Sequence, residues 1–151
     1  MIARNPALAA ALLISGCAAQ VGPSSAEALS PNQRPLVASV CEINREAASA
    51  QRRSRLVSIT AGAWYDFEYG YKLIDDGCGD PMTGLLPVSF PPGTSHAIPP
   101  DGYPELAKLH SDEFMRSALG KRIYCKCVGE VTFSDGHPTF LLHRAEKVWA
   151  E

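Results

Sequence analysis

The stretch Lys121–Phe133, "KRIYCKCVGEVTF", decides the fold because its side chains alternate between apolar and polar. One face of an extended chain here would carry Ile123, Cys125, Cys127, Val131 and Phe133, and the other Lys126, Glu130 and Thr132. Alternation with a period of two is typical of a strand that buries one face. The sequence therefore predicts a half-buried strand over these residues.

A hairpin follows from this strand. The segment Ser134–Pro138, "SDGHP", combines Asp-Gly with Pro and predicts a turn. The segment 139–150, "TFLLHRAEKVWA", then returns as a final strand.

A second hairpin is expected in residues 55–78, "RLVSITAGAWYDFEYGYKLIDDGC". Its first strand places Val57, Ile59, Ala61 and Ala63 on one face, and Tyr69, Tyr71 and Leu73 alternate on the return strand. The turn between them is expected near Asp66. A further short strand is predicted in residues 84–90, "GLLPVSF".

Two helices complete the expected elements. The first covers Glu42–Gln51, with acids before bases as the helix dipole favours. The cluster Arg52, Arg53 and Arg55 would then be a solvated helix end, the alternative being a binding patch. The second helix covers Pro104–Leu119, with Gly120 placed to end it and a break possible near His110-Ser111.

After the first helix, the order strand, strand, strand, helix, strand, strand is similar to the OB-fold. The pattern "SVCEI…RLVSITAGAWY…LIDDGC" also resembles small bacterial envelope proteins whose strand pair follows a Val-Cys-Glu turn. The expected class is mainly β (α+β): an OB-fold-like five-stranded barrel, with an extra N-terminal helix and a helix between strands 3 and 4. A generic α+β sandwich is the alternative.

The first residues have the layout of a secretory signal peptide, with Arg4 ahead of a short apolar run. The run ends in Ile14-Ser15-Gly16-Cys17, which resembles the lipobox of bacterial lipoproteins. That resemblance implies acylation of Cys17 and cleavage before it, and Ala18 at the next position implies sorting to the outer membrane. A plain signal peptide with an accidental cysteine, or a core helix, is the alternative.

The chain therefore divides into a signal peptide at 1–16, a lipidated flexible tether at 17–35 and one globular domain at 36–151. The tether is rich in Ala, Ser, Pro and Gln, which cannot repay the entropy cost of ordering. Arg4 is the one charged residue before Cys17, so the mature chain has 13 Lys and Arg against 16 Asp and Glu, a net charge of −3. This mild acidity argues against a nucleic-acid partner.

Four cysteines remain in the domain, and an oxidising compartment favours disulfides. We expect Cys41 to pair with Cys78. Cys125 and Cys127 lie two apart on one strand face, and we expect them to be too far apart for an easy mutual bond. Core packing or a disulfide is the preferred explanation of these cysteines, and a metal site that uses Cys125 and Cys127 with Cys41 and Cys78 is the alternative.

No catalytic or cofactor motif of the common classes occurs, so the sequence predicts no cofactor. The histidines His96, His110, His137 and His143 are scattered. Cys127 and His143 on neighbouring strands could make a nucleophile and base, but a third orienting group is missing. Asp75, Asp76 and Asp80 lack the ligand order of an EF-hand and are expected to form a polar turn.

The aromatic residues of the second hairpin are the candidate ligand or partner surface: Trp64, Tyr65, Phe67, Tyr69 and Tyr71. OB-folds use aromatics on such strands for stacking. Alternation would bury about half of these rings, so core packing competes with a binding role.

Two functions follow. The first is a membrane-anchored periplasmic module without catalysis, which binds another envelope protein or a small ligand. The alternative is a metal-handling or thiol-dependent enzyme that uses Cys125, Cys127 and His143.

Overall fold

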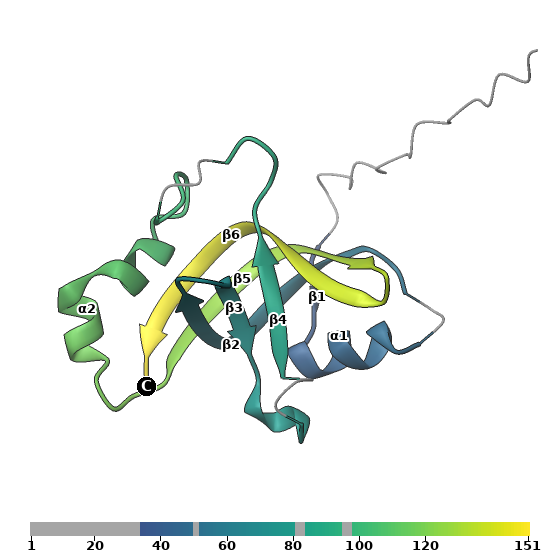
Figure 1. The fold of residues 1–151 in the computed structure, drawn as a ribbon, viewed down its shortest axis with the longest axis horizontal. Helices are drawn as coiled ribbons and strands as arrows, with labels where there is room; N and C mark the ends of the chain where they lie inside the picture. The colour runs from purple at the N-terminus through teal and green to yellow at the C-terminus, as the bar shows by residue number, and fades with distance from the viewer. Residues whose placement is uncertain (1–33, 50–51, 81–83, 95–97) are drawn as a thin grey trace, which may run out of the picture.

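The computed structural model describes residues 34–49, 52–80, 84–94 and 98–151 (Figure 1). Residues 1–33, including Cys17, and His96 lie outside this part. The described chain is mainly β, as expected, with one mixed sheet of six strands and a few short helices.

The strands β5 (Ile123–Ser134) and β6 (His137–Ala150) form the predicted C-terminal hairpin. They pair antiparallel from Ser134↔His137 to Ile123↔Ala150. The turn residues Asp135 and Gly136 have φ of 50° and 84°. Positive φ at both central positions is required by a type I′ turn, the tight turn that matches the strand twist. In Figure 1 the hairpin forms two long curved ribbons that cross the molecule.

The strand β2 (Arg55–Asp66) changes partner along its length. It pairs antiparallel with β5 from Arg55 to Gly62, and with β3 (Gly70–Ile74) from Gly62 to Asp66. A Cβ at Gly62 would lie 3.1 Å from the Ile74 carbonyl oxygen and 3.7 Å from that of Ile123. A glycine at this position therefore lets β2 approach β3 closely, while the distance to β5 is that of an ordinary contact.

The strand β4 (Leu85–Ser89) pairs antiparallel with β3 and parallel with β6. The strand order is β1-β2-β3-β4-β6-β5, and β2 also pairs with β5. The pairings thus run from β2 through β3, β4, β6 and β5 and return to β2. Fully or almost fully buried side chains of these strands belong to the hydrophobic core: Val57, Ile59, Leu73, Leu86, Cys125, Val131, Phe140, Leu142 and Val148.

The N-terminal part of the domain differs from the sequence prediction. A two-residue strand, β1 (Leu36–Val37), pairs parallel with β2 and was not expected. The helix α1 covers Val40–Ala47 rather than Glu42–Gln51. It begins with a capping box, in which the Ser39 amide donates to the Glu42 carboxylate at 2.8 Å and the Glu42 amide donates to Ser39 Oγ at 3.2 Å.

The early end of α1 also corrects the interpretation of the arginine cluster. Arg55 lies in β2 and forms an ion pair with Glu46 of α1, and Arg52 Nε donates to the Ser49 carbonyl at 3.1 Å. Arg55 is therefore not part of a solvated helix end, whereas the side chains of Arg52 and Arg53 are exposed. At least Arg55 joins the helix to the sheet.

A disulfide joins Cys41 of α1 to Cys78 of the 3-10 helix η1 (Asp76–Cys78), with the two Cα atoms 5.1 Å apart. This is the expected pairing. One turn later in α1, Asn44 contacts β4, because its Nδ2 donates to the Leu85 carbonyl at 3.1 Å.

A second disulfide joins Cys125 to Cys127, and our expectation that these residues would not bond was wrong. In a regular strand, Cα atoms two positions apart lie about 6.6 Å from each other, at the far limit of disulfide geometry. The pairing of β5 with β6 shifts register between Lys126 and Cys127, and the two Cα atoms lie 5.9 Å apart. The extra residue at this shift belongs to β6, and β5 keeps an unbroken register with β2 here, so the shorter Cα separation itself is what permits the bond.

The segment between β4 and β5 is helical but broken, as expected near His110-Ser111. The 3-10 helix η2 covers Leu106–His110 and α2 covers Asp112–Ser117. Ser111 separates them and caps α2, with the Phe114 amide donating to its Oγ at 3.4 Å. In Figure 1 α2 lies at the left of the molecule, beside the last residues of β6.

Candidate functional site

Two of the five aromatics of the β2–β3 hairpin pack against the core, and the other three are exposed to solvent. Tyr71 is buried and Tyr65 is half-buried. Trp64, Phe67 and Tyr69 are exposed, at 57 %, 91 % and 64 %. Alternation along the strands produces this division, so the five residues do not form a single surface.

The inner aromatics form a packed cluster that attaches η2 to the sheet. The Tyr65 ring lies 4.8 Å from Tyr71 and 4.6 Å from His110, and Tyr71 lies 5.5 Å from Phe90. Tyr71 Oη and His110 Nε2 share a hydrogen bond of 2.6 Å. The sequence offered no signal for this cluster, because His110 and Phe90 are far from the hairpin along the chain.

Burial sets the charge state of this cluster. It raises the pKa of Tyr71 to about 12, with a smaller contribution from the neighbouring Tyr65. It also lowers the pKa of His110. Both groups are therefore neutral at pH 7, which suits a structural hydrogen bond between two partly buried rings.

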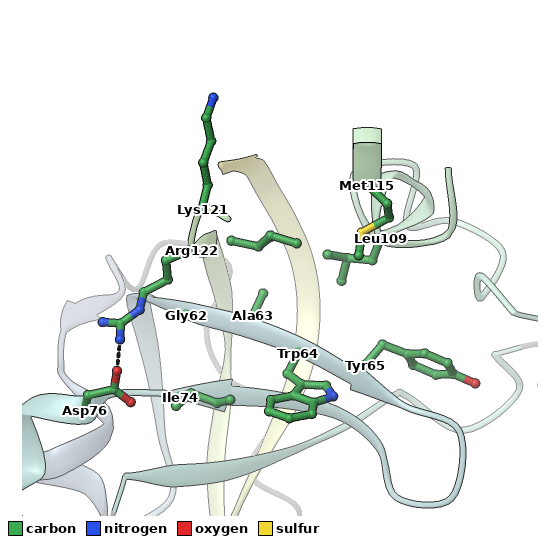
Figure 2. A pocket seen from close by; sticks show the side chains of 11 residues that line it. Gly62, Ala63, Trp64, Tyr65, Ile74, Asp76, Leu109, Met115, Lys121 and Arg122 are labelled. Carbon is green, nitrogen blue, oxygen red and sulfur yellow. Dashed lines mark hydrogen bonds and ion pairs between the residues drawn. The ribbon is translucent and has the colours of Figure 1, made fainter. Parts of the chain in front are cut away.

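The exposed Trp64 borders two hollows on the surface. The first, which we call the Trp64 groove, has a volume of about 460 Å³. Its lining comes from β2, β3, η2, α2 and the start of β5, and includes Ala63, Trp64, Ile74, Leu109, Met115 and Ile123. Figure 2 shows β2 running along one side of this groove, with Leu109 and Met115 on the other. Its walls are therefore largely apolar.

Charged residues stand at one end of the Trp64 groove. Arg122 is ion-paired with Asp76 of η1, as the dashed line in Figure 2 marks. Lys121 is exposed at the rim, and Figure 2 shows its side chain extended away from that pair. Two cations and one carboxylate leave this end with a formal charge of +1, in a chain whose net charge is −2.

The second hollow lies on the other side of Trp64, with a volume of about 660 Å³. Asp66 and Asp75 line it, and both carboxylates accept local backbone hydrogen bonds. Asp66 accepts from the amides of Glu68 and Tyr69, and Asp75 from that of Gly77. Asp75 thus belongs to a polar turn, as the sequence predicted for the aspartate cluster.

The residues of the alternative thiol or metal site, Cys125, Cys127 and His143, do not all come together in the structure. Cys125 and Cys127 are buried and bonded to each other. Cys127 lies opposite Ala145 of β6, while His143 is exposed. Among the described residues, the one group with metal-ligand spacing is Cys41, Asp75 and Cys78. Its two sulfurs are bonded as a disulfide and are not thiolate ligands.

No family model, curated protein or solved structure matches this chain. Within the part that the structure describes, no helix has the length and apolar character needed to cross a membrane.

Proposed function

We propose that the protein is a lipid-anchored, non-catalytic binding module of the bacterial envelope, held on the outer membrane and facing the periplasm. The observation that carries the binding role is the exposure of Trp64 between two hollows. Tryptophan is enriched among the residues that dominate interface energies, because its large ring combines apolar area with a polar N–H. The bound partner is another envelope protein or a small ligand.

The lipobox Ile14-Ser15-Gly16-Cys17 supports the anchor. Several acyl chains on Cys17, each buried CH₂ contributing about 0.8 kcal/mol, hold a domain stably on a membrane surface. A tether of residues 17–35 then lets the domain reach partners above that surface.

The strand pairings support the finer proposal that β2 to β6 form an OB-fold barrel. The ring of pairings β2–β3–β4–β6–β5–β2 and the helical segment between β4 and β5 are the features that favour it. The parallel pairing of β4 with β6 completes this ring of pairings, and it joins two strands that are far apart along the chain. An α+β sandwich would not need the additional β2–β5 pairing.

Photo-cross-linking in intact cells tests the binding role. A benzoylphenylalanine at Trp64 in the lipidated protein should give adducts of discrete mass, because the probe sits between the two hollows. The matched control places the probe at Val37, which is 90 % exposed on β1 and lines neither hollow. Adducts that are identical at both positions, or absent from position 64, would contradict the proposal.

The substitution Cys17→Ser tests the anchor. Without the thiol, no acyl chain can be attached, so palmitate labelling should disappear and the protein should leave the membrane fraction or persist as an uncut precursor. Labelling and fractionation of cells expressing each form give the measurement. Undiminished palmitate incorporation in Cys17→Ser would refute the anchor.

A further inference from the structure

One edge of β2 lacks a partner strand where it borders the Trp64 groove. From Arg55 to Gly62 this edge pairs with β5, and the ladder stops at the pair Gly62↔Tyr124. Residues Ala63–Asp66 pair with β3 on the opposite edge only, among the residues that the structure describes. Before β5, Arg122 exchanges two backbone hydrogen bonds with Glu151, each 2.9 Å long, which continue the β5–β6 ladder on the edge away from β2.

A strand edge of this kind recruits extended chains, because its free N–H and C=O groups can continue the ladder. The free edge is four residues long, or about 13 Å at a rise of roughly 3.3 Å per residue. It is too short for a long strand, but it suits a few residues of a peptide.

The walls of the groove suit the side chains of such a peptide. Ala63, Trp64 and Ile74 lie on the sheet side, and Leu109 and Met115 lie opposite (Figure 2). Methionine is flexible and polarizable and adapts to different apolar partners. The volume of about 460 Å³ lies in the range of small ligand sites.

The groove is closed at its Gly62 end, so a bound peptide must end there. An added strand cannot continue past Gly62, because β5 already occupies that edge. The cations at this end, Lys121 and Arg122, favour a carboxylate over an amine. Arg122 is already paired with Asp76, whereas no ion pair is seen for Lys121 within the described chain.

We therefore propose that the Trp64 groove binds the C-terminal residues of an extended polypeptide by strand addition to Ala63–Asp66, with the terminal carboxylate at Lys121. Backbone hydrogen bonds hold the peptide, the apolar walls receive alternate side chains, and Lys121 recognises the chain end. This inference rests on the proposed function, because it names the partner chemistry of the same groove.

Binding of a degenerate hexapeptide pool to the full-length, ¹⁵N-labelled protein in detergent tests the proposal. The pool with free C-terminal carboxylates should shift the amide signals of Ala63–Asp66 and protect from exchange the alternate amides that face away from β3. The same pool with C-terminal amides should bind at least tenfold more weakly, because it lacks the charge that Lys121 recognises.

Lys121→Gln should remove most of the difference between the two pools without unfolding the protein, since this side chain is exposed. The matched control is Lys147→Gln, an exposed lysine of β6 that lines neither hollow and should preserve the difference. Equal binding of the two pools, shifts confined to the second hollow, or no binding at millimolar peptide would each overturn the proposal. If the peptides fail while cross-linking from position 64 still gives discrete adducts, this inference falls and the proposed function stands.

Discussion

At the scale of single residues, two positions show how closely the sheet is packed. Gly129 of β5 is buried at a point where β5 and β6 shift register. A Cβ at Gly129 would lie 2.3 Å from the Leu141 carbonyl oxygen and 2.8 Å from Phe140 Cζ. His110 is the second position, because its ring is enclosed by Tyr65 and Tyr71.

We expect Gly129→Ala to lower the free energy of unfolding by about 1–3 kcal/mol, the usual range for overpacking. The closest atom belongs to the backbone of β6, which cannot move aside as a side chain can. Gly77→Ala is the control, because its nearest neighbour is the side chain of Asp75. Urea unfolding of both variants gives the comparison, and equal stabilities would show that β6 relaxes freely.

The enclosure of His110 makes stability depend on pH. Burial lowers the pKa of His110 in the folded state, whereas the unfolded value is about 6.5. The unfolded chain therefore binds the proton more readily, so stability is complete above about pH 6.5 and falls as the pH drops through the folded pKa. Unfolding measured at pH 7.5 and 5.5 should show a smaller loss for His110→Gln than for the wild type. His143→Gln, at an exposed histidine, is the matched control. If both variants reduce the loss of stability at pH 5.5 equally, His110 is not its cause.

At the scale of elements, α1 depends on its first turn. The helix has eight residues, which is too short to be stable by itself in water. Packing of its buried face, at Val40 and Ile43, stabilises it, and the capping box and the disulfide at Cys41 add to this. The hydrogen bond from the Ser39 amide also lowers the pKa of Glu42, which keeps the carboxylate charged beside the helix N-terminus.

Ser39→Ala should lower the free energy of unfolding by about 1 kcal/mol, because one amide of the first turn loses its acceptor. The control is Ser54→Ala, an exposed serine outside any helix. Chemical unfolding is the measurement, and amide exchange at Glu42 locates the effect. Equal stability of the two variants would mean that water replaces the cap without cost.

The elements were predictable where a periodic pattern was present. Alternation along Ile123–Phe133 and Val57–Ala63 predicts both hairpins, and Asp135-Gly136 predicts a tight turn. The two-residue β1 is too short for any period, and its side chains are exposed. The end of α1 was misplaced because the alanines after Glu46 favour a helix by propensity, while the structure ends the helix at Ala47.

The candidate site was predictable only in part, because its lining residues come from segments far apart along the chain. Trp64 and Tyr69 are visible as aromatics of one hairpin. Met115 and Lys121 reach the same groove through pairings about 60 residues apart, which no local pattern contains. The bond between Cys125 and Cys127 requires a Cα separation of 5.9 Å, shorter than in a regular strand, and alternation does not reveal that difference.

At the scale of the whole molecule, the Cys41–Cys78 disulfide links the N-terminal helix to the segment before β4 across 37 positions. Replacing both cysteines by alanine should lower the free energy of unfolding by about 4 kcal/mol on the chain-entropy model, because the unfolded chain gains freedom. Denaturant unfolding of the oxidised protein and the double variant gives the difference. Non-reducing peptide mapping is the control that the bond exists in the wild type, and unchanged stability despite a mapped bond would contradict the expectation.

The position of β6 between β4 and β5 has a consequence for biosynthesis. When β2 to β5 have been synthesised, β4 can pair with β3 but still lacks its second neighbour, β6. The edges of β4 and β5 stay open until residues 137–150 arrive, and long-range pairings of this kind form slowly. The sheet is therefore complete only after residues 137–150 have been synthesised and have paired with both β4 and β5.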